Sequence, residues 1–282
     1  MLPVVSFCNV NITRLVIGGN PFSGNSHVSR KMDAEMEDFF TCEKIKQTLF
    51  RCMECGINTT QLRGDRHILR VLREFRAEGG NLHWIAQTTP ESISFEGNIR
   101  QMAAFGAVAI YHHGSVTDKL FKEGEYDEIA RRLMEIRKTG LPVGLGTHMP
   151  QVIEYAEEHH WETDFYMACV YNLSRIERES SAITGKANEG EPFFEEDIPV
   201  MYKTIRSVSK PCIAFKILGA TRRCQTQETV KAAFTEAFRN IKSGDVVNVG
   251  VYPKDIDQVA LNAEYTRQAT TEEAAKVTAA KA

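Results

Sequence analysis

The chain of 282 residues is short of several features that would place it in a special class of protein. It has 34 Lys and Arg residues against 37 Asp and Glu residues, so its net charge of −3 leaves no basic excess for binding a nucleic-acid duplex. No apolar run approaches the ~20 residues that cross a bilayer. The N-terminal stretch MLPVVSFCNVNITR also lacks the basic, apolar and small-residue segments of a signal peptide. We therefore expect no nucleic-acid partner and no membrane partner.

Glycine and proline are also few, with 19 and 9 residues. Together with 43% hydrophobic and 25% charged residues, these numbers exclude collagen-like, disordered and disulfide-scaffold chains. The seven cysteines are odd in number, and several lie in apolar, strand-like runs, which is typical of reduced thiols. We therefore expect a soluble, globular, cytoplasmic protein.

What the sequence does contain is a regular alternation of two patterns. Short β-branched runs are followed by longer stretches in which apolar residues recur at helical spacing. Glycines such as Gly56, Gly106 and Gly140 stand where a helix should stop before a strand. The expected strands are residues 14–19, 57–61, 82–88, 107–112, 142–146, 164–170, 212–217 and 246–250. Helices are expected between them, for instance over 41–55, 65–77, 126–139, 150–160 and 226–241.

Eight strand–helix units in about 250 residues predict a closed parallel (β/α)₈ barrel, a single α/β domain. An open doubly wound sheet shows the same alternation with fewer strands, and no Gly-x-Gly-x-x-Gly motif opens the first helix. We assign residues 1–268 to the barrel and the Ala-, Thr- and Lys-rich residues 269–282 to a flexible tail. The long connection over 172–196 follows the sixth strand, where barrel active sites lie, so we expect it to be functional or mobile.

Because barrel active sites lie at the C-terminal ends of the strands, a polar set of residues becomes the candidate site. This set is rich in amides, contains three histidines and is short of carboxylates. The residues expected to bind a small-molecule substrate are Asn20, Gln61, Gln87, His148, Tyr171 and Asn172. The residues expected to take part in catalysis are His112, His113, Lys216 and Arg63.

The adjacent histidines are the most specific feature of this set. Neighbouring residues on a strand point to opposite faces, so only one of His112 and His113 reaches the barrel mouth, where an imidazole suits acid–base chemistry. Lys216 lies in an otherwise apolar strand, so its ammonium must reach water, an anion or a reacting carbonyl. Arg63 precedes Asp65, which we interpret as a helix N-cap, and Arg63 is then available to bind a carboxylate or phosphate.

A metal site is the weaker interpretation of the same side chains. It needs a third or fourth ligand beside His113 and His148, and only Asp65 is available in the ring. We therefore expect no metal.

Five segments of the chain resemble the aldo-keto reductase superfamily, in the family's order: GINTTQ, AIYHHG, ACVYNLSR, CIAFKILGA and VNVGVYPKDIDQVALNA. The resemblance implies the same barrel and NADPH-dependent reduction of a carbonyl, with Phe215 against the nicotinamide and Lys254 toward a phosphate. Of the family's catalytic tetrad, the resemblance keeps only the strand-four histidine, at His112. Gln61 stands in place of the aspartate, Gln87 stands in place of the lysine, and no tyrosine follows in the next loop.

These replacements lead us to expect a rebuilt site, because an amide neither lowers a neighbour's pKa as an ammonium does nor protonates an alkoxide. We expect an enzyme that acts on a small polar carbonyl or sugar-like molecule by histidine acid–base chemistry rather than by hydride transfer. His112 or His113 is its acid–base group, with the family motif favouring His112, and Lys216 or Arg63 is its electrostatic partner. The alternatives are an NADPH-dependent aldo-keto oxidoreductase and a barrel that binds a metabolite without catalysis. The cofactor, whether NADP or none, and the oligomeric state stay open.

Overall fold

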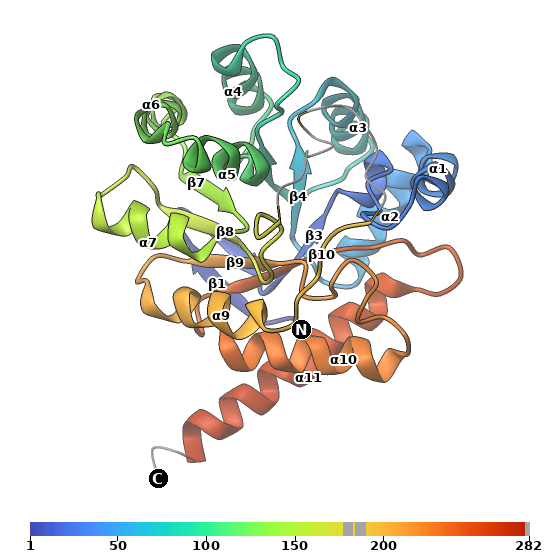
Figure 1. Ribbon diagram of the computed structural model, residues 1–282. Helices are drawn as coiled ribbons and strands as arrows, with labels where there is room; N and C mark the ends of the chain where they lie inside the picture. The colour runs from blue at the N-terminus through green and yellow to red at the C-terminus, as the bar shows by residue number, and fades with distance from the viewer. Residues whose placement is uncertain (177–182, 184–189, 280–282) are drawn as a thin grey trace.

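A computed structural model describes residues 1–176, 183 and 190–279 of the chain. Eight parallel strands form a closed barrel in the order β10–β3–β4–β5–β6–β7–β8–β9 (Figure 1). They are β3 (Leu15–Gly18), β4 (Thr59–Arg63), β5 (His83–Gln87), β6 (Ala109–His112), β7 (Val143–Thr147), β8 (Phe165–Cys169), β9 (Cys212–Phe215) and β10 (Val246–Gly250). The predicted (β/α)₈ barrel is confirmed, and each of the expected strands overlaps an observed one.

Helices surround the barrel (Figure 1). They are α1 (Arg30–Phe39), α2 (Cys42–Glu54), α3 (Arg66–Ala77), α4 (Phe95–Ala104), α5 (Gly114–Lys122), α6 (Tyr126–Arg137), α7 (Pro150–Glu158), α9 (Asp197–Ser207), α10 (Gln227–Asn240) and α11 (Gln258–Ala279), with a short 3₁₀ helix, η1 (Pro21–Ser23). Local capping fixes several of their starts. The side chains of Thr41 and Asp65 accept backbone N–H hydrogen bonds at the beginnings of α2 and α3, which confirms Asp65 as an N-cap.

The strands divide the core into two parts because successive side chains point to opposite faces. Inner-facing residues such as Val16, Tyr111 and Phe165 form one buried cluster inside the barrel. The residues between them face the helices and form the larger cluster. Gly144 leaves room inside, since a Cβ at this position would lie 2.3 Å from Cζ of Phe165.

An antiparallel hairpin of β1 (Val4–Phe7) and β2 (Val10–Thr13) precedes the barrel. Phe7 and Ile12 from this hairpin are fully buried in the inner cluster, and the Phe7 ring lies 5.0 Å from that of Phe165. The hairpin therefore closes the N-terminal end of the barrel. No sequence signal marks this hairpin, because each strand has four residues and Cys8, rather than a glycine, adopts the positive φ of 49° at the turn.

The C-terminal segment continues as a helix where we expected a flexible tail. Helix α11 runs through Ala279, past the expected barrel limit at residue 268. Glu273 pairs with Arg14 at the start of the barrel, and Glu272 lies 3.0 Å from Arg239 of α10. These ion pairs anchor the first part of the expected tail to the barrel.

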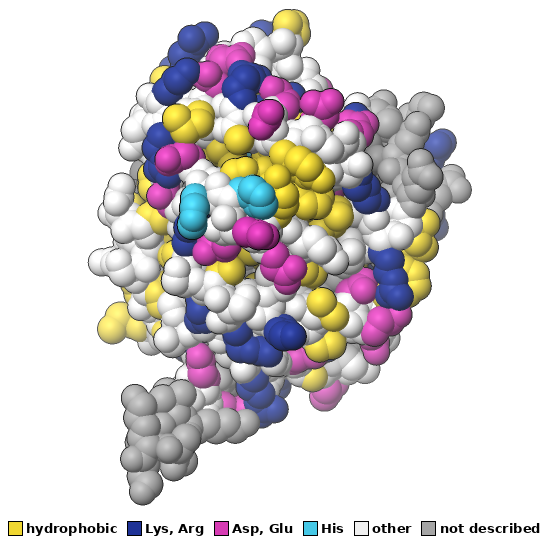
Figure 2. Space-filling model, turned by 60° about the vertical axis from the view of Figure 1, so that its left-hand side comes forward, with side chains coloured by type: hydrophobic (Ala, Val, Ile, Leu, Met, Phe, Trp, Pro, Cys, Tyr) yellow, Lys and Arg dark blue, Asp and Glu magenta, His cyan; other side chains and the backbone are white. Residues whose placement is uncertain are grey.

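Within the described part of the chain, no helix combines the length and the apolar character needed to span a membrane. Figure 2 shows one side of the molecule, where basic and acidic side chains are interspersed and histidines lie at the surface beside hydrophobic side chains. This mixture of charges accords with the small net charge of −3.

Candidate functional site

The alternation of the strands decides which histidines reach the C-terminal mouth of the barrel. On β7, a Cβ at Gly144 would meet Tyr111 inside the barrel, so Gly146 and His148 continue the same inner face. On β6, Tyr111 belongs to the inner cluster, so His113 follows it on the inner face. His113 and His148 are therefore the histidines that the strands direct to the mouth.

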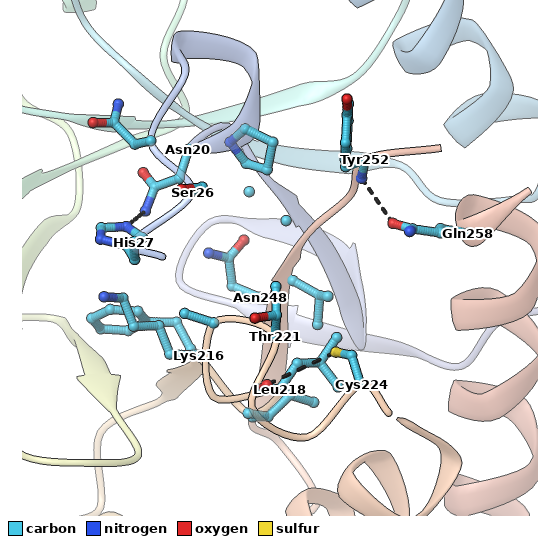
Figure 3. A pocket seen from close by; sticks show the side chains of 18 of the residues that line it. Asn20, Ser26, His27, Lys216, Leu218, Thr221, Cys224, Asn248, Tyr252 and Gln258 are labelled. Carbon is cyan, nitrogen blue, oxygen red and sulfur yellow. Dashed lines mark hydrogen bonds between the residues drawn. The ribbon is translucent and has the colours of Figure 1, made fainter. Parts of the chain in front are cut away.

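A cavity of about 460 Å³ opens at this mouth, beside the C-terminal ends of β3, β9 and β10 (Figure 3). Its volume lies in the range of small-molecule sites, about 300–1,000 Å³. Among the described residues that line it, the ones with a basic or acidic side chain of the Lys, Arg, Asp or Glu type are Lys216 and Asp255. Eight amide side chains also line it: Asn20, Asn25, Gln61, Gln87, Gln227, Asn248, Gln258 and Asn262. Of the residues expected to bind substrate, Asn20, Gln61 and Gln87 lie together here.

One pair of these amides has an unused acceptor. Asn248 Nδ2 donates to Gln61 Oε1 at 3.1 Å. Asn248 Oδ1 is buried and has no hydrogen-bond partner among the described residues. Gly18 leaves room for this side chain, since a Cβ there would lie 2.9 Å from Asn248 Nδ2. A buried acceptor without a partner costs about 1–3 kcal/mol, so this atom favours a ligand that donates a hydrogen bond.

A buried carboxylate joins two of the cavity residues. Glu191 comes from the connection after β8, and it lies 2.7 Å from His27 Nδ1 and 2.5 Å from Lys216 Nζ. Its side chain is 1% exposed. Burial alone raises the pKa of Glu191, but the charge of Lys216 and the hydrogen bond from His27 outweigh it and hold this pKa well below its usual range.

The partners of His27 define its protonation. Its Nδ1 faces the Glu191 carboxylate, which accepts a hydrogen bond, so Nδ1 carries a proton. Asn20 Nδ2 lies 2.9 Å from Nε2 (Figure 3), so Nε2 presents its lone pair to a donor. His27 and Asn20 both line the cavity, and a ligand that replaces the Asn20 amide would meet a basic nitrogen.

The backbone around Lys216 corrects the expectation that it lies in a strand. Strand β9 ends at Phe215, and Lys216 takes a φ of 62°. Ala220 and Thr221, which also line the cavity, have φ values of 47° and 75°. Such left-handed conformations cost about 1–2 kcal/mol per residue, so strain is concentrated in this wall of the cavity. The turn brings the ammonium to Glu191.

A second histidine–carboxylate pair lies on the β7 side of the mouth. His148 Nδ1 is 2.7 Å from Asp118 Oδ2. The hydroxyls of Thr147 and Ser174 donate to the same carboxylate at 2.5 and 3.0 Å. Because the carboxylate accepts, Nδ1 of His148 carries a proton and Nε2 is left as the basic nitrogen. The ring meets Phe215 edge-on at 5.6 Å, and Phe215 lines the cavity.

His113 is the N-cap of α5. Its Nδ1 accepts the backbone N–H of Ser115 at 3.2 Å, so the proton of the neutral ring lies on Nε2. Burial holds the pKa of His113 well below its usual value, and the charge of Arg63 lowers it further. His113 is therefore a neutral N–H donor at pH 7, placed in the same end of the barrel as the other two histidines.

The expectation that His112 reaches the mouth is wrong. Its Nδ1 lies 2.7 Å from Thr117 Oγ1, its ring lies 5.9 Å from that of Phe95, and its Nε2 lies 3.5 Å from Arg132 Nη1. These partners belong to α4, α5 and α6, so the side chain packs between the barrel and the helices. Burial and the nearby Arg132 charge lower the pKa of His112 to about 3.

We expect these two buried histidines to make the fold sensitive to acid. The folded protein keeps His112 and His113 neutral, whereas the unfolded chain binds protons below about pH 6.5. Their contribution to stability is therefore complete above that pH and is lost as the pH falls, by up to about 1.4 kcal/mol per pH unit for each histidine. Urea unfolding between about pH 7 and pH 5 should show a smaller slope for His112→Gln. A slope equal to that of the wild type would contradict a neutral, buried His112.

Arg63 and Asp65 form an ion pair with each other. Arg63 lies 3.2 Å from Asp65 and also pairs with Glu91, so two carboxylates already neutralise it. Asp65 also caps α3. The residues that the structure describes contain no group of three or more His, Cys, Asp or Glu side chains able to hold a metal ion. The alternative of a metal bound by His113, His148 and Asp65 is corrected accordingly.

The remaining predicted residues do not lie together in one place. Tyr171 is fully buried, with its ring 4.9 Å from that of Phe193, and Asn172 shapes its own loop by accepting the Ser174 N–H at 2.9 Å. Phe215 lines the cavity, whereas Lys254 lines a different surface depression. The two residues assigned to NADPH therefore do not share one cavity. Residues 177–182 and 184–189 of the connection expected to be functional lie outside the described residues.

Four residues with a clear place in this site are absent from the predicted set: His27, Asp118, Glu191 and Asn248. Asn248 carried a signal, because it is an amide in the otherwise apolar strand VVNVG. The other three lie in loops or on a helix, where no spacing marks them.

Comparisons with known proteins agree with the barrel. No protein-family model matches the sequence, and no curated protein matches it. The chain resembles the solved structure of a truncated 3-deoxy-D-arabino-heptulosonate 7-phosphate synthase from Thermotoga maritima, with 15% identity and a TM-score of 0.55 over 97% of this chain and 93% of that chain. It also resembles the dihydropteroate synthase of Yersinia pestis, with 11% identity and a TM-score of 0.55 over 96% of this chain and 98% of that chain.

These findings overturn the resemblance to the aldo-keto reductase superfamily. The two barrels just named are synthases, and no family model matches. The segments that carried the resemblance lie at strand–helix junctions, where any barrel of this kind needs glycines, amides and apolar residues. The histidine that matched the motif, His112, points away from the mouth. At such low identities the likeness shows the fold alone, and the chain is a (β/α)₈ barrel.

Proposed function

We propose that this protein is an enzyme that binds a small, uncharged, hydroxyl-rich carbonyl compound of the sugar type and moves a proton beside its carbonyl group. The observation that carries the proposal is the amide-lined cavity with the His27–Glu191 pair at its edge. Amide groups donate and accept hydrogen bonds without carrying charge, so they match hydroxyl groups. The charge of Lys216 is already balanced by Glu191 before a substrate binds, which favours an uncharged substrate.

Binding would use the unused acceptor of the cavity. A substrate hydroxyl that donates to Asn248 Oδ1 satisfies the buried atom that has no partner among the described residues. The same hydroxyl accepts from Gln61 Nε2, because Gln61 Oε1 is already taken by Asn248. One hydroxyl thus meets a donor and an acceptor side by side. A substrate with a hydrogen or an ether oxygen at that carbon cannot satisfy both groups.

Proton transfer would use His27. Its Nε2 removes the proton from the carbon next to the carbonyl, and Glu191 stabilises the imidazolium through Nδ1–H. The electron pair of the broken C–H bond forms the enediolate, whose oxygen takes up negative charge. Lys216 has N–H donors besides the one directed at Glu191, and neutral His113 offers its Nε2–H, so both suit that oxygen.

The direct test is exchange of carbon-bound hydrogen with solvent. The protein is incubated in D₂O with a panel of uncharged aldoses and 2-ketoses, and loss of the ¹H NMR signal next to the carbonyl is followed. We expect at least one sugar to exchange faster than in buffer alone. Sugars that bind without exchange would favour a metabolite-binding barrel, and turnover of NADPH with the same panel would favour a reductase; either result would contradict the proposal.

Asn248→Leu should separate binding from stability. The substitution removes the unpaired Oδ1 acceptor of Asn248 and leaves the Gln61 Oε1 acceptor without its donor. These two effects have opposite signs, so the midpoint of thermal unfolding should stay close to that of the wild type. Affinity for the exchanging sugar should fall about 5–150-fold, the equivalent of about 1–3 kcal/mol. Calorimetric titration measures the affinity. An unchanged affinity would remove Asn248 from the binding site.

A further inference from the structure

The mouth of the barrel holds two histidine–carboxylate pairs that arise from opposite sides. His27 follows β3 and pairs with Glu191, whereas His148 follows β7 and pairs with Asp118. In the closed order of eight strands, β3 and β7 are separated by three strands in either direction. The two strands are therefore diametrically opposite in the barrel. His27 lines the cavity, and His148 borders it through Phe215.

His148 is held in a fixed orientation by hydrogen bonds and lies next to the cavity. Its side chain lies on the inner face of β7 and ends against Phe215, which lines the cavity. Asp118 is 2% exposed and receives hydrogen bonds from His148 Nδ1, from the His148 backbone N–H, and from the Thr147 and Ser174 hydroxyls. This set fixes the carboxylate, which in turn fixes the ring and keeps the proton on Nδ1.

We propose that His148, held by Asp118, is a second proton-transfer group that acts on the face of the substrate opposite to His27, so that the protein inverts a stereocentre next to a carbonyl. This inference rests on the proposed function and names its reaction class, epimerisation. It needs no oxidant or reductant, because the same bond is broken and remade. His27 and His148 then have matched roles, each as the base for one epimer and the acid for the other.

In one direction of the reaction, His27 is the base and His148 is the acid. His27 Nε2 takes the proton from carbon, and the C–H electron pair becomes the C=C bond of an enediolate. His148, protonated at both nitrogens, gives its Nε2 proton to the opposite face of that carbon, and the carbonyl is restored. His27 leaves the cycle protonated and His148 leaves it neutral, and exchange with solvent resets both.

The experiment separates exchange from inversion in D₂O, with an uncharged aldose or 2-ketose that exchanges in the wild type and with its epimer at the carbon next to the carbonyl. In the wild type we expect the early product epimer to carry deuterium while the remaining substrate does not. With His148→Gln, the epimer deprotonated by His27 should take up deuterium without inversion, at a rate within a few-fold of the total deuterium uptake in the wild type, while inversion falls about 10²–10⁴-fold. With His27→Asn the pattern should reverse, and the other epimer should be the one that exchanges.

The outcomes are distinguishable. Absence of exchange in the wild type would overturn the proposed function itself. Exchange without inversion in the wild type, or equal loss of both reactions in a folded His148→Gln, would overturn the opposed pair alone. If His148→Gln does not fold, Ser174→Ala takes its place, because it removes a single hydrogen bond to Asp118. That variant should slow inversion several-fold and leave exchange unchanged, and an unchanged ratio of the two rates would also overturn the inference.

Discussion

Replacing Glu191 with glutamine is expected to destabilise the fold by about 3–5 kcal/mol, the usual effect of removing one partner from a buried ion pair. The Lys216 side chain is 9% exposed and lies 2.5 Å from the Glu191 carboxylate. A neutral amide in that place leaves the ammonium without its counter-charge in a site that water hardly reaches. Urea unfolding at pH 7 measures the difference in free energy.

The double variant Glu191→Gln, Lys216→Met is the control for this prediction. Removing both charges removes the need for compensation, so the double variant should recover a large part of the loss. Glu191→Gln within about 0.5 kcal/mol of the wild type would show that the pair is not buried in solution as it is in this structure.

His27→Asn is expected to slow the exchange of carbon-bound hydrogen by about 10²–10⁴-fold, the usual contribution of a positioned acid–base group. Asparagine is chosen because His27 has a φ of 63°, a backbone region that asparagine tolerates better than other residues with a side chain. NMR in D₂O measures the rate for the epimer that the wild type exchanges through His27.

The matched control for that variant is His160→Asn. His160 also takes a left-handed conformation, with a φ of 51°, but it is exposed at the end of α7. The same substitution in the same backbone region should therefore leave exchange at the wild-type rate. Equal losses in both variants would mean that a general effect on folding, rather than loss of a base, is being measured.

The fold could be predicted because each strand–helix unit repeats the same physical pattern. Buried parallel strands are apolar on both faces, helices are amphipathic, and glycines such as Gly56 and Gly140 stand between them with positive φ. The hairpin that closes the barrel lacked such signals. Its contribution to the core, Phe7 and Ile12, depends on contacts with residues far along the chain.

The choice between His112 and His113 could not be made from the sequence. Both faces of β6 are buried, so the residues before the two histidines are apolar on both faces of the strand. Their hydrophobicity therefore does not indicate which face points into the barrel. The family motif favoured His112, and the structure turns it outward against Thr117. The position of Tyr111 inside the barrel settles the register, and that contact is long-range.

The histidine–carboxylate pairs were beyond sequence reasoning for a similar reason. His27 and Glu191 lie in two loops far apart in the chain and meet only because the barrel brings the ends of β3 and β8 to one mouth. In the sequence, Asp118 has the pattern of an ordinary polar residue of a helix. Its contact with His148 depends on the fold. Residues in loops carry no periodicity, so a single sequence gives them no register.

The central claim, that the amide-lined cavity is where a sugar-type carbonyl compound binds for proton transfer, is tested most directly by a crystal structure. Crystals of the protein are soaked with a sugar that exchanges in D₂O. The claim predicts ligand density in the cavity, with a hydroxyl donating to Asn248 Oδ1 and the exchanging carbon facing His27 Nε2. Density confined to another surface, such as the depression beside Lys254, with the cavity filled by solvent, would contradict it.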